Sequence, residues 1–81
     1  MSDFIEIIPI VDKKYYFSFS KVIIPHGVKF SVTILENDDA IVFDMKSAKD
    51  GWKIVQPVPE WIKKTEDKLS EAIKIRVDLK I

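Results

Sequence analysis

The residue types that carry out most enzyme chemistry are sparse in this chain. His26 is the only histidine, and the sequence contains no cysteine. An imidazole acts as a general base when a nucleophile and an orienting acid lie beside it. His26 instead stands between Pro25 and Gly27, and both of these residue types are typical of turns. The pattern therefore favours a turn histidine over a catalytic residue or a single metal ligand.

A group of acidic residues in the middle of the chain is the second candidate for chemistry. Carboxylate oxygens are ligands for calcium, but this group lacks the ligand spacing and the glycine of an EF-hand loop. Aspartate also favours hairpin turns, because its side chain bonds to the nearby backbone. We therefore expect a turn here, no metal site and no cofactor. The acidic residues are Glu36, Asp38, Asp39 and Asp44.

No segment has the residues and spacing of a known catalytic motif. The sequence contains no phosphate-binding loop, no dinucleotide-binding glycine motif, no zinc-protease motif and no nucleophile elbow. With two glycines among 81 residues, a loop that wraps closely around a phosphate is difficult to build. So short a chain also has few residues to line a ligand pocket of about 300–1,000 Å³. These absences predict that the protein is not an enzyme.

Aromatic residues are the remaining candidates for a binding site. Trp52 and Trp61 flank a double-proline corner, and we expect them to pack a helix onto a sheet, since aromatic rings bury large areas. The alternative is a partly exposed aromatic ledge for a peptide, a sugar or a base. Tyr15 and Tyr16 are neighbours in a strand, so their rings point to opposite faces and one of them faces solvent. The candidate binding residues are Tyr16, His26, Trp52 and Trp61.

Alternating apolar and polar residues dominate the first two thirds of the chain. This period is typical of strands with one buried face, and its cleanest run covers residues 28–34. Turn residues recur at intervals too short for crossover helices, so the sheet should be antiparallel. Proline cannot donate a ladder hydrogen bond, so Pro9 places the first strand at an edge of the sheet or ends it there. We expect an antiparallel meander of about five strands.

The repeat changes at the double-proline corner, where Pro57 and Pro59 end the last strand. Pro59 suits the first position of a helix, and the apolar residues that follow predict one amphipathic helix on the apolar face of the sheet. From Ile73 to Ile81 the apolar residues alternate strictly again. A short terminal strand explains this alternation better than a continued helix, although no turn residue separates the two elements. The predicted class is α+β, with one small domain over residues 1–81.

The charges of the chain are balanced, since 13 basic residues match 13 acidic ones. Nucleic-acid binders usually carry a basic excess that neutralises phosphates, so nucleic acid is a disfavoured partner. No signal peptide and no long apolar run occur, which predicts a cytoplasmic protein without a membrane partner. A weak nucleic-acid binder would use the lysines near Tyr15 and Tyr16, which are Lys13, Lys14, Lys21 and Lys29.

Taken together, these features favour a small non-catalytic protein, above all a protein–protein interaction or regulatory module with an unknown protein partner. The high apolar content, 47% of the residues, indicates a dense core or self-association. A strand over Ile73–Ile81 would pair with the edge of a second copy and form a homodimer. The first alternative is a small-ligand-binding protein or enzyme whose site at a subunit interface uses Tyr16, His26, Trp52 and Trp61. The second is the weak nucleic-acid binder.

Overall fold

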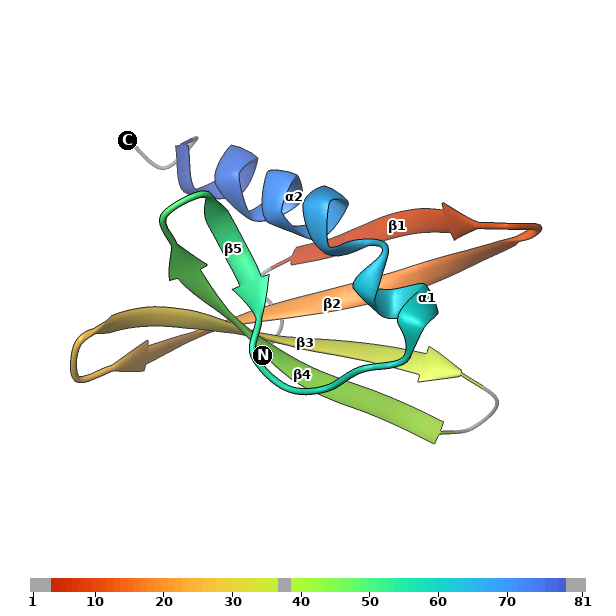
Figure 1. Cartoon of the computed structure of the whole chain (residues 1–81), viewed down its shortest axis with the longest axis horizontal. Coiled ribbons are helices and arrows are strands. Elements are labelled where there is room, and N and C mark those ends of the chain that lie inside the picture. The colour runs from red at the N-terminus through yellow and green to blue at the C-terminus, as the bar shows by residue number, and fades with distance from the viewer. Residues whose placement is uncertain (1–3, 37–38, 79–81) are drawn as a thin grey trace.

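The computed structural model describes residues 4–36 and 39–78. In these residues the strands precede the helices (Figure 1), in the order β1 (Phe4–Ile10), β2 (Lys13–Ile24), β3 (Gly27–Glu36), β4 (Asp39–Ala48), β5 (Gly51–Ile54), α1 (Glu60–Lys63) and α2 (Glu66–Asp78). The strands form one five-stranded sheet in sequence order, and each strand pairs antiparallel with the next. The predicted α+β class and the antiparallel meander of five strands are confirmed.

The buried residues of the sheet occupy alternate positions of each strand. Phe19, Val32 and Phe43 face one another across β2, β3 and β4, and none of them is more than 1% exposed. Phe17 and Ile34 form the next row of this inner face. Successive side chains of a strand point to opposite faces, so the outer face of the sheet lies away from the core.

Both helices lie over the inner face of the sheet (Figure 1). Ile62 of α1, with Leu69 and Ile73 of α2, is fully buried in the same apolar cluster as the strand residues. Full burial of one such side chain contributes about 1.5–3 kcal/mol. These three residues therefore attach the helices to the sheet. Among the strands, β5 is the closest neighbour of α2.

The C-terminal segment is helical as far as the structure describes it, so the predicted terminal strand is wrong for residues 73–78. α2 continues through this segment to Asp78. Ile73 is fully buried whereas Ile75 is 55% exposed, so the two isoleucines do not share one buried row as a strand would require. The lack of a turn residue after Ala72 is the sequence feature that agrees with the helix. Residues 79–81 lie outside the described part of the chain.

The predicted single helix is two helices that meet at Thr65. The Thr65 hydroxyl donates a hydrogen bond of 2.6 Å to the Ile62 carbonyl, and the Thr65 carbonyl accepts the N–H of Leu69 at 2.9 Å. Threonine favours helix ends because its side chain bonds to nearby backbone groups, so the chain changes direction here without a glycine. Pro59 is the N-cap of α1, one residue before its predicted place inside the helix.

Candidate functional site

The predicted binding residues lie on separate surfaces of the chain. Tyr16 is on the outer face of β2 and is 60% exposed, as expected for the solvent-facing tyrosine of the pair. Trp52 is on the inner face of β5, where its ring meets the Phe30 ring edge-on with the centroids 5.3 Å apart. His26 lies in the turn between β2 and β3. A sheet face, the opposite face and a turn do not form one site within a single chain.

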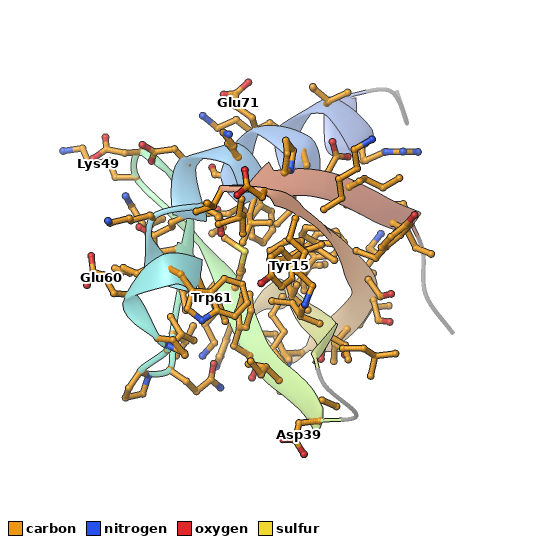
Figure 2. All side chains as sticks on the ribbon, turned by 90° about the vertical axis from the view of Figure 1, so that its right-hand side faces the viewer. Tyr15, Asp39, Lys49, Glu60, Trp61 and Glu71 are labelled. Carbon is orange, nitrogen blue, oxygen red and sulfur yellow. The ribbon has the colours of Figure 1, made fainter. Side chains whose placement is uncertain are left out.

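Trp61 contacts a tyrosine on a distant strand. Its ring centroid lies 4.8 Å from that of Tyr15, with an angle of 36° between the ring planes, and the two side chains lie together in Figure 2. Both rings are partly buried against the core, and Lys13 Nζ lies 5.3 Å from the Tyr15 ring centroid. Aromatic pairs of this kind add to the energy of area burial, so Trp61 packs α1 against β2.

A group of large apolar side chains is exposed on the outer face of the sheet, toward one end of its strands. Alternation along the strands places these side chains opposite the buried rows. The register pairs Ile7 with Tyr16, and a second row crosses the sheet through Ser18 and Thr33. The outer-face patch consists of Ile5 (52% exposed), Ile7 (48%), Tyr16 (60%), Leu35 (75%) and Val42 (58%).

A polar network borders the outer-face patch next to Val42. Lys29 Nζ and Gln56 Nε2 each donate to Asp44 Oδ2 at 3.0 Å, and Gln56 Oε1 accepts the backbone N–H of Asp44 at 2.6 Å. The Gln56 hydrogen bond is the largest influence on Asp44 and lowers the pKa of its carboxyl; partial burial opposes this shift, and Lys29 adds to it. Asp44 therefore stays ionised as part of a fixed polar border.

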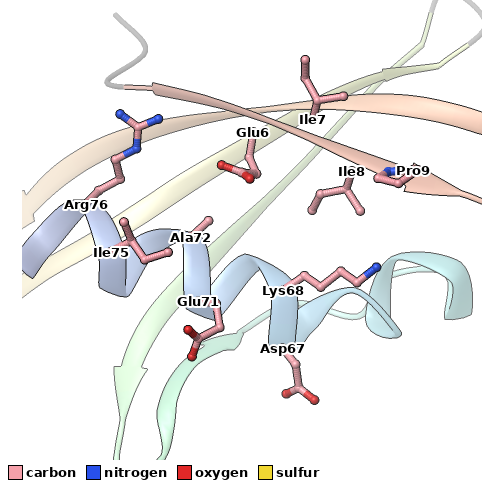
Figure 3. A pocket seen from close by; sticks show the side chains of 10 residues that line it. All are labelled: Glu6, Ile7, Ile8, Pro9, Asp67, Lys68, Glu71, Ala72, Ile75 and Arg76. Atoms are coloured by element: carbon pink, nitrogen blue, oxygen red, sulfur yellow. The ribbon is translucent and has the colours of Figure 1, made fainter.

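A groove runs along the inner side of β1, between that strand and the helices. Its larger section has a volume of about 700 Å³ and lies between β1 and α2, and a section of about 520 Å³ adjoins it beside α1. Pro9 and Lys68 line both sections. Figure 3 shows Glu6 and Ile8 pointing from β1 toward α2, while Ile7 points to the other side of the strand.

The edge strand β5 is covered by side chains of α2. The backbone N–H of Trp52 donates to Ser70 Oγ at 2.9 Å, and that of Ile54 donates to Glu66 Oε2 at 2.8 Å. Burial is the largest single influence on the pKa of Glu66 and raises it. The hydrogen bonds from Ile54 and Lys63, together with the charges of nearby lysines, outweigh burial, so the net effect is a lowered pKa. The carboxylate that accepts the Ile54 N–H at the β5 edge is thus the charged form of Glu66.

The edge strand β1 has no such cover in the part of the chain that the structure describes. β1 is the other end of the strand order, and no helix side chain there donates or accepts a hydrogen bond with its backbone. An open edge with apolar side chains is a template for pairing with another strand. In the described residues, α2 therefore covers the β5 edge of the sheet, and the β1 edge is open.

The outer-face patch and the groove were not among the predicted sites, although part of the signal is in the sequence. Leu35 and Val42 directly adjoin the inward residues Ile34 and Ile41, so alternation alone turns them outward. What the sequence does not show is that both described helices, α1 and α2, lie over the inner face and leave the outer face uncovered. Glu6, likewise, alternates with apolar residues, but its place in a groove depends on the position of α2.

The acidic group lies where β3 and β4 meet, because Glu36 pairs with Asp39 across the two strands, and the residues of the expected turn between them, 37 and 38, lie outside the described part of the chain. Asp39 begins β4, Asp44 lies on the outer face, and Asp38 is outside the described residues. Over residues 4–36 and 39–78, the carboxylates and His26 form no cluster suited to a metal ion. Over the same ranges, neither helix combines the length and apolar character needed to cross a bilayer. No protein-family model, curated protein or solved structure matches the chain.

Proposed function

We propose that this protein is a non-catalytic interaction module that binds another protein through the outer-face patch. The observation that carries the proposal is the gathering of exposed large apolar side chains from neighbouring strands on a sheet face that no described element covers. Scattered apolar residues on a surface need no explanation, whereas a contiguous group with a polar border is typical of a protein-binding surface.

The composition of the patch suits protein recognition. Tyr16 has an apolar ring with a polar hydroxyl, a combination that is enriched at the centre of protein interfaces. Leu35 and Val42 lie on neighbouring strands and are more than half exposed. Burying such side chains against a partner returns about 25 cal/mol for each Å² of apolar surface removed from water. The Lys29–Asp44–Gln56 network gives the partner a fixed polar rim beside the apolar centre.

The test compares proteins cross-linked to the purified chain in extracts of its native cell. We expect the double variant Leu35→Lys, Val42→Lys to lose a partner that the wild type and an Ile23→Lys control both retain. Ile23 is a suitable control because it is 81% exposed but lies outside the patch. The proposal is abandoned if capture by the double variant equals capture by the wild type while circular dichroism shows all three proteins folded.

The other functions considered from the sequence gain no comparable support. A small-ligand site at a subunit interface would have to draw Tyr16 and Trp52 from opposite faces of the sheet. In the nucleic-acid reading, Lys29 is already paired with Asp44 at 3.0 Å. A homodimer through residues 73–81 would require a strand in this segment, but the described part of the segment is helical. A cytoplasmic location remains a prediction of the sequence.

A further inference from the structure

We propose that the open edge of β1 and the groove beside it bind an extended peptide, which adds as a sixth strand and carries a lysine or arginine facing Glu6. This site is separate from the centre of the outer-face patch, because the groove is on the inner side of β1. Its main determinants are the backbone of β1, the carboxylate of Glu6 and the facing side of α2.

The backbone of β1 offers hydrogen bonds on its free side. Pro9 has no N–H, and a proline in a paired strand is accommodated where that position faces the edge. Backbone groups alternate in direction along an antiparallel strand, so Ile5 and Ile7 share the outward direction of Pro9. The same alternation is seen at β5, where Trp52 and Ile54 direct their N–H groups away from β4. An extended peptide is the ligand whose backbone matches this repeat.

The groove accepts the side chains that such a peptide would turn inward. Ile8 from β1 and Ala72 and Ile75 from α2 provide its apolar lining. Ile75 is 55% exposed although it lies on a helix next to the core. A volume of about 700 Å³ in this section has room for several side chains. Every second residue of the peptide would enter the groove and cover Ile75.

The charge of the peptide follows from Glu6. Its carboxylate points into the groove, is partly buried, and has no ion pair or hydrogen bond with any residue that the structure describes. Two cations also line this section, but neither is paired with Glu6. The Arg76 guanidinium lies 4.8 Å from the Phe4 ring centroid, and Lys68 forms no ion pair with a residue that the structure describes. A partly buried carboxylate gains most from a charged donor, so the inward residue opposite Glu6 should be lysine or arginine.

The same charge argues against a second copy of this chain as the occupant. Antiparallel pairing of β1 with its own copy, about a two-fold axis at Ile5, Glu6 or Ile7 in the middle of the strand, places Glu6 directly or diagonally across from Glu6 of the other molecule. Like charges at such positions destabilise a strand pair. A foreign strand with a basic residue avoids this repulsion.

The test uses a phage-displayed library of random heptapeptides selected against the full chain. The wild type should enrich peptides with lysine or arginine flanked two residues away by apolar residues. A synthetic peptide of that pattern should shift the backbone amide resonances of Ile5 and Ile7. Glu6→Gln, which keeps the shape of the side chain, should weaken its binding roughly tenfold or more. Leu35→Lys is the control and should bind the peptide as the wild type does.

Three results would overturn this proposal. For Glu6→Lys we expect the opposite preference, for acidic residues. The first contradicting result is a selection that enriches no basic residue with the wild type, or that enriches the same residues with Glu6→Lys as with the wild type. The second is binding that leaves the amides of Ile5 and Ile7 unshifted. The third is a dimer in light scattering that Ile7→Lys converts to monomer, which would make a second copy the occupant. Loss of the outer-face partner with peptide binding intact would separate this site from the proposed function.

Discussion

The hydroxyl of Ser70 accepts the backbone N–H of Trp52 at 2.9 Å, across 18 residues of sequence. This bond joins the middle of α2 to the edge strand β5, and Ser70 is 8% exposed. One turn earlier, Glu66 makes the equivalent bond to Ile54. Together these bonds let a helix take the place that a sixth strand would occupy beside β5. At the opposite edge of the sheet, the described residues provide no such hydrogen bonds to β1.

Ser70→Ala should destabilise the fold, because it leaves the Trp52 N–H without its acceptor in a partly buried place. A buried donor that loses its partner costs about 1–3 kcal/mol. Urea unfolding followed by tryptophan fluorescence measures this change. Ser47→Ala is the control, because Ser47 is exposed and should shift the midpoint little. Equal midpoints for Ser70→Ala and the wild type would show that the bond contributes nothing.

Gly51→Ala should destabilise the protein more than Gly27→Ala. Both glycines have a positive φ, +134° and +146°, which an alanine adopts only with strain. A Cβ at Gly27 would meet no atom within 4 Å, whereas a Cβ at Gly51 would lie 2.5 Å from Ser70 Oγ. The difference between the two free energies of unfolding therefore reports the crowding at Gly51, which includes Ser70 and the end of the Lys74 side chain at 3.2 Å. We expect this difference to be about 1–3 kcal/mol.

Combining Gly51→Ala with Ser70→Ala provides a check on this interpretation. Removing the Ser70 hydroxyl removes the atom that the new Cβ would meet, so the two losses should not add. A double variant whose loss equals the sum of the single losses would mean that the cost at Gly51 does not come from Ser70.

The sheet could be read from the sequence because its signal is local. Alternation over residues 28–34 fixes which side of β3 is buried, and Pro9 correctly indicates an edge strand. The split of the helix at Thr65 was missed, since a threonine at a helix end differs little in sequence from one on a helix surface. The tail was misread for a different reason. Strict alternation after Ile73 suits a strand, but in α2 Ile73 is buried whereas Ile75 is exposed.

The candidate sites could be predicted less well, because they depend on what covers each surface. Tyr15 and Tyr16 were expected on opposite faces, and Tyr16 is the one that faces solvent. Alternation turns Leu35 outward, but it does not show that the outer face is left uncovered. The groove at Glu6 depends on where α2 lies over the sheet. The same is true of the bond between Ser70 and Trp52, whose partners are in different elements.

Stability should fall in acid as Glu66 and Asp44 take up protons. The pKa of each carboxyl is lowered in the folded chain, so each binds a proton more tightly when unfolded. Their contribution is therefore fully present above the unfolded pKa, about 4, and is lost as pH falls through the lower folded pKa. Urea midpoints between pH 7 and about pH 2 should show this loss. Glu66→Gln should flatten the acid limb, and an acid limb as steep as that of the wild type would contradict this assignment.

The turn between β1 and β2 contains a residue whose replacement should stabilise the fold. Val11 has a φ of +57°, the only positive φ among the non-glycine residues that the structure describes, and it is 94% exposed. A β-branched residue in this region is strained by about 1–3 kcal/mol. Glycine relieves that strain and loses about 0.4–1 kcal/mol through the greater freedom of the unfolded chain.

Val11→Gly should therefore raise the free energy of unfolding by about 1 kcal/mol, with little packing lost because the valine is exposed. Val11→Ala is the matched control, since alanine removes the branch but keeps the Cβ that opposes a positive φ, and it should stabilise less than glycine. Urea unfolding of the three proteins measures the order. If glycine proved the least stable of the three, the strain assigned to Val11 would be absent, and β1 would enter its turn by a different backbone path.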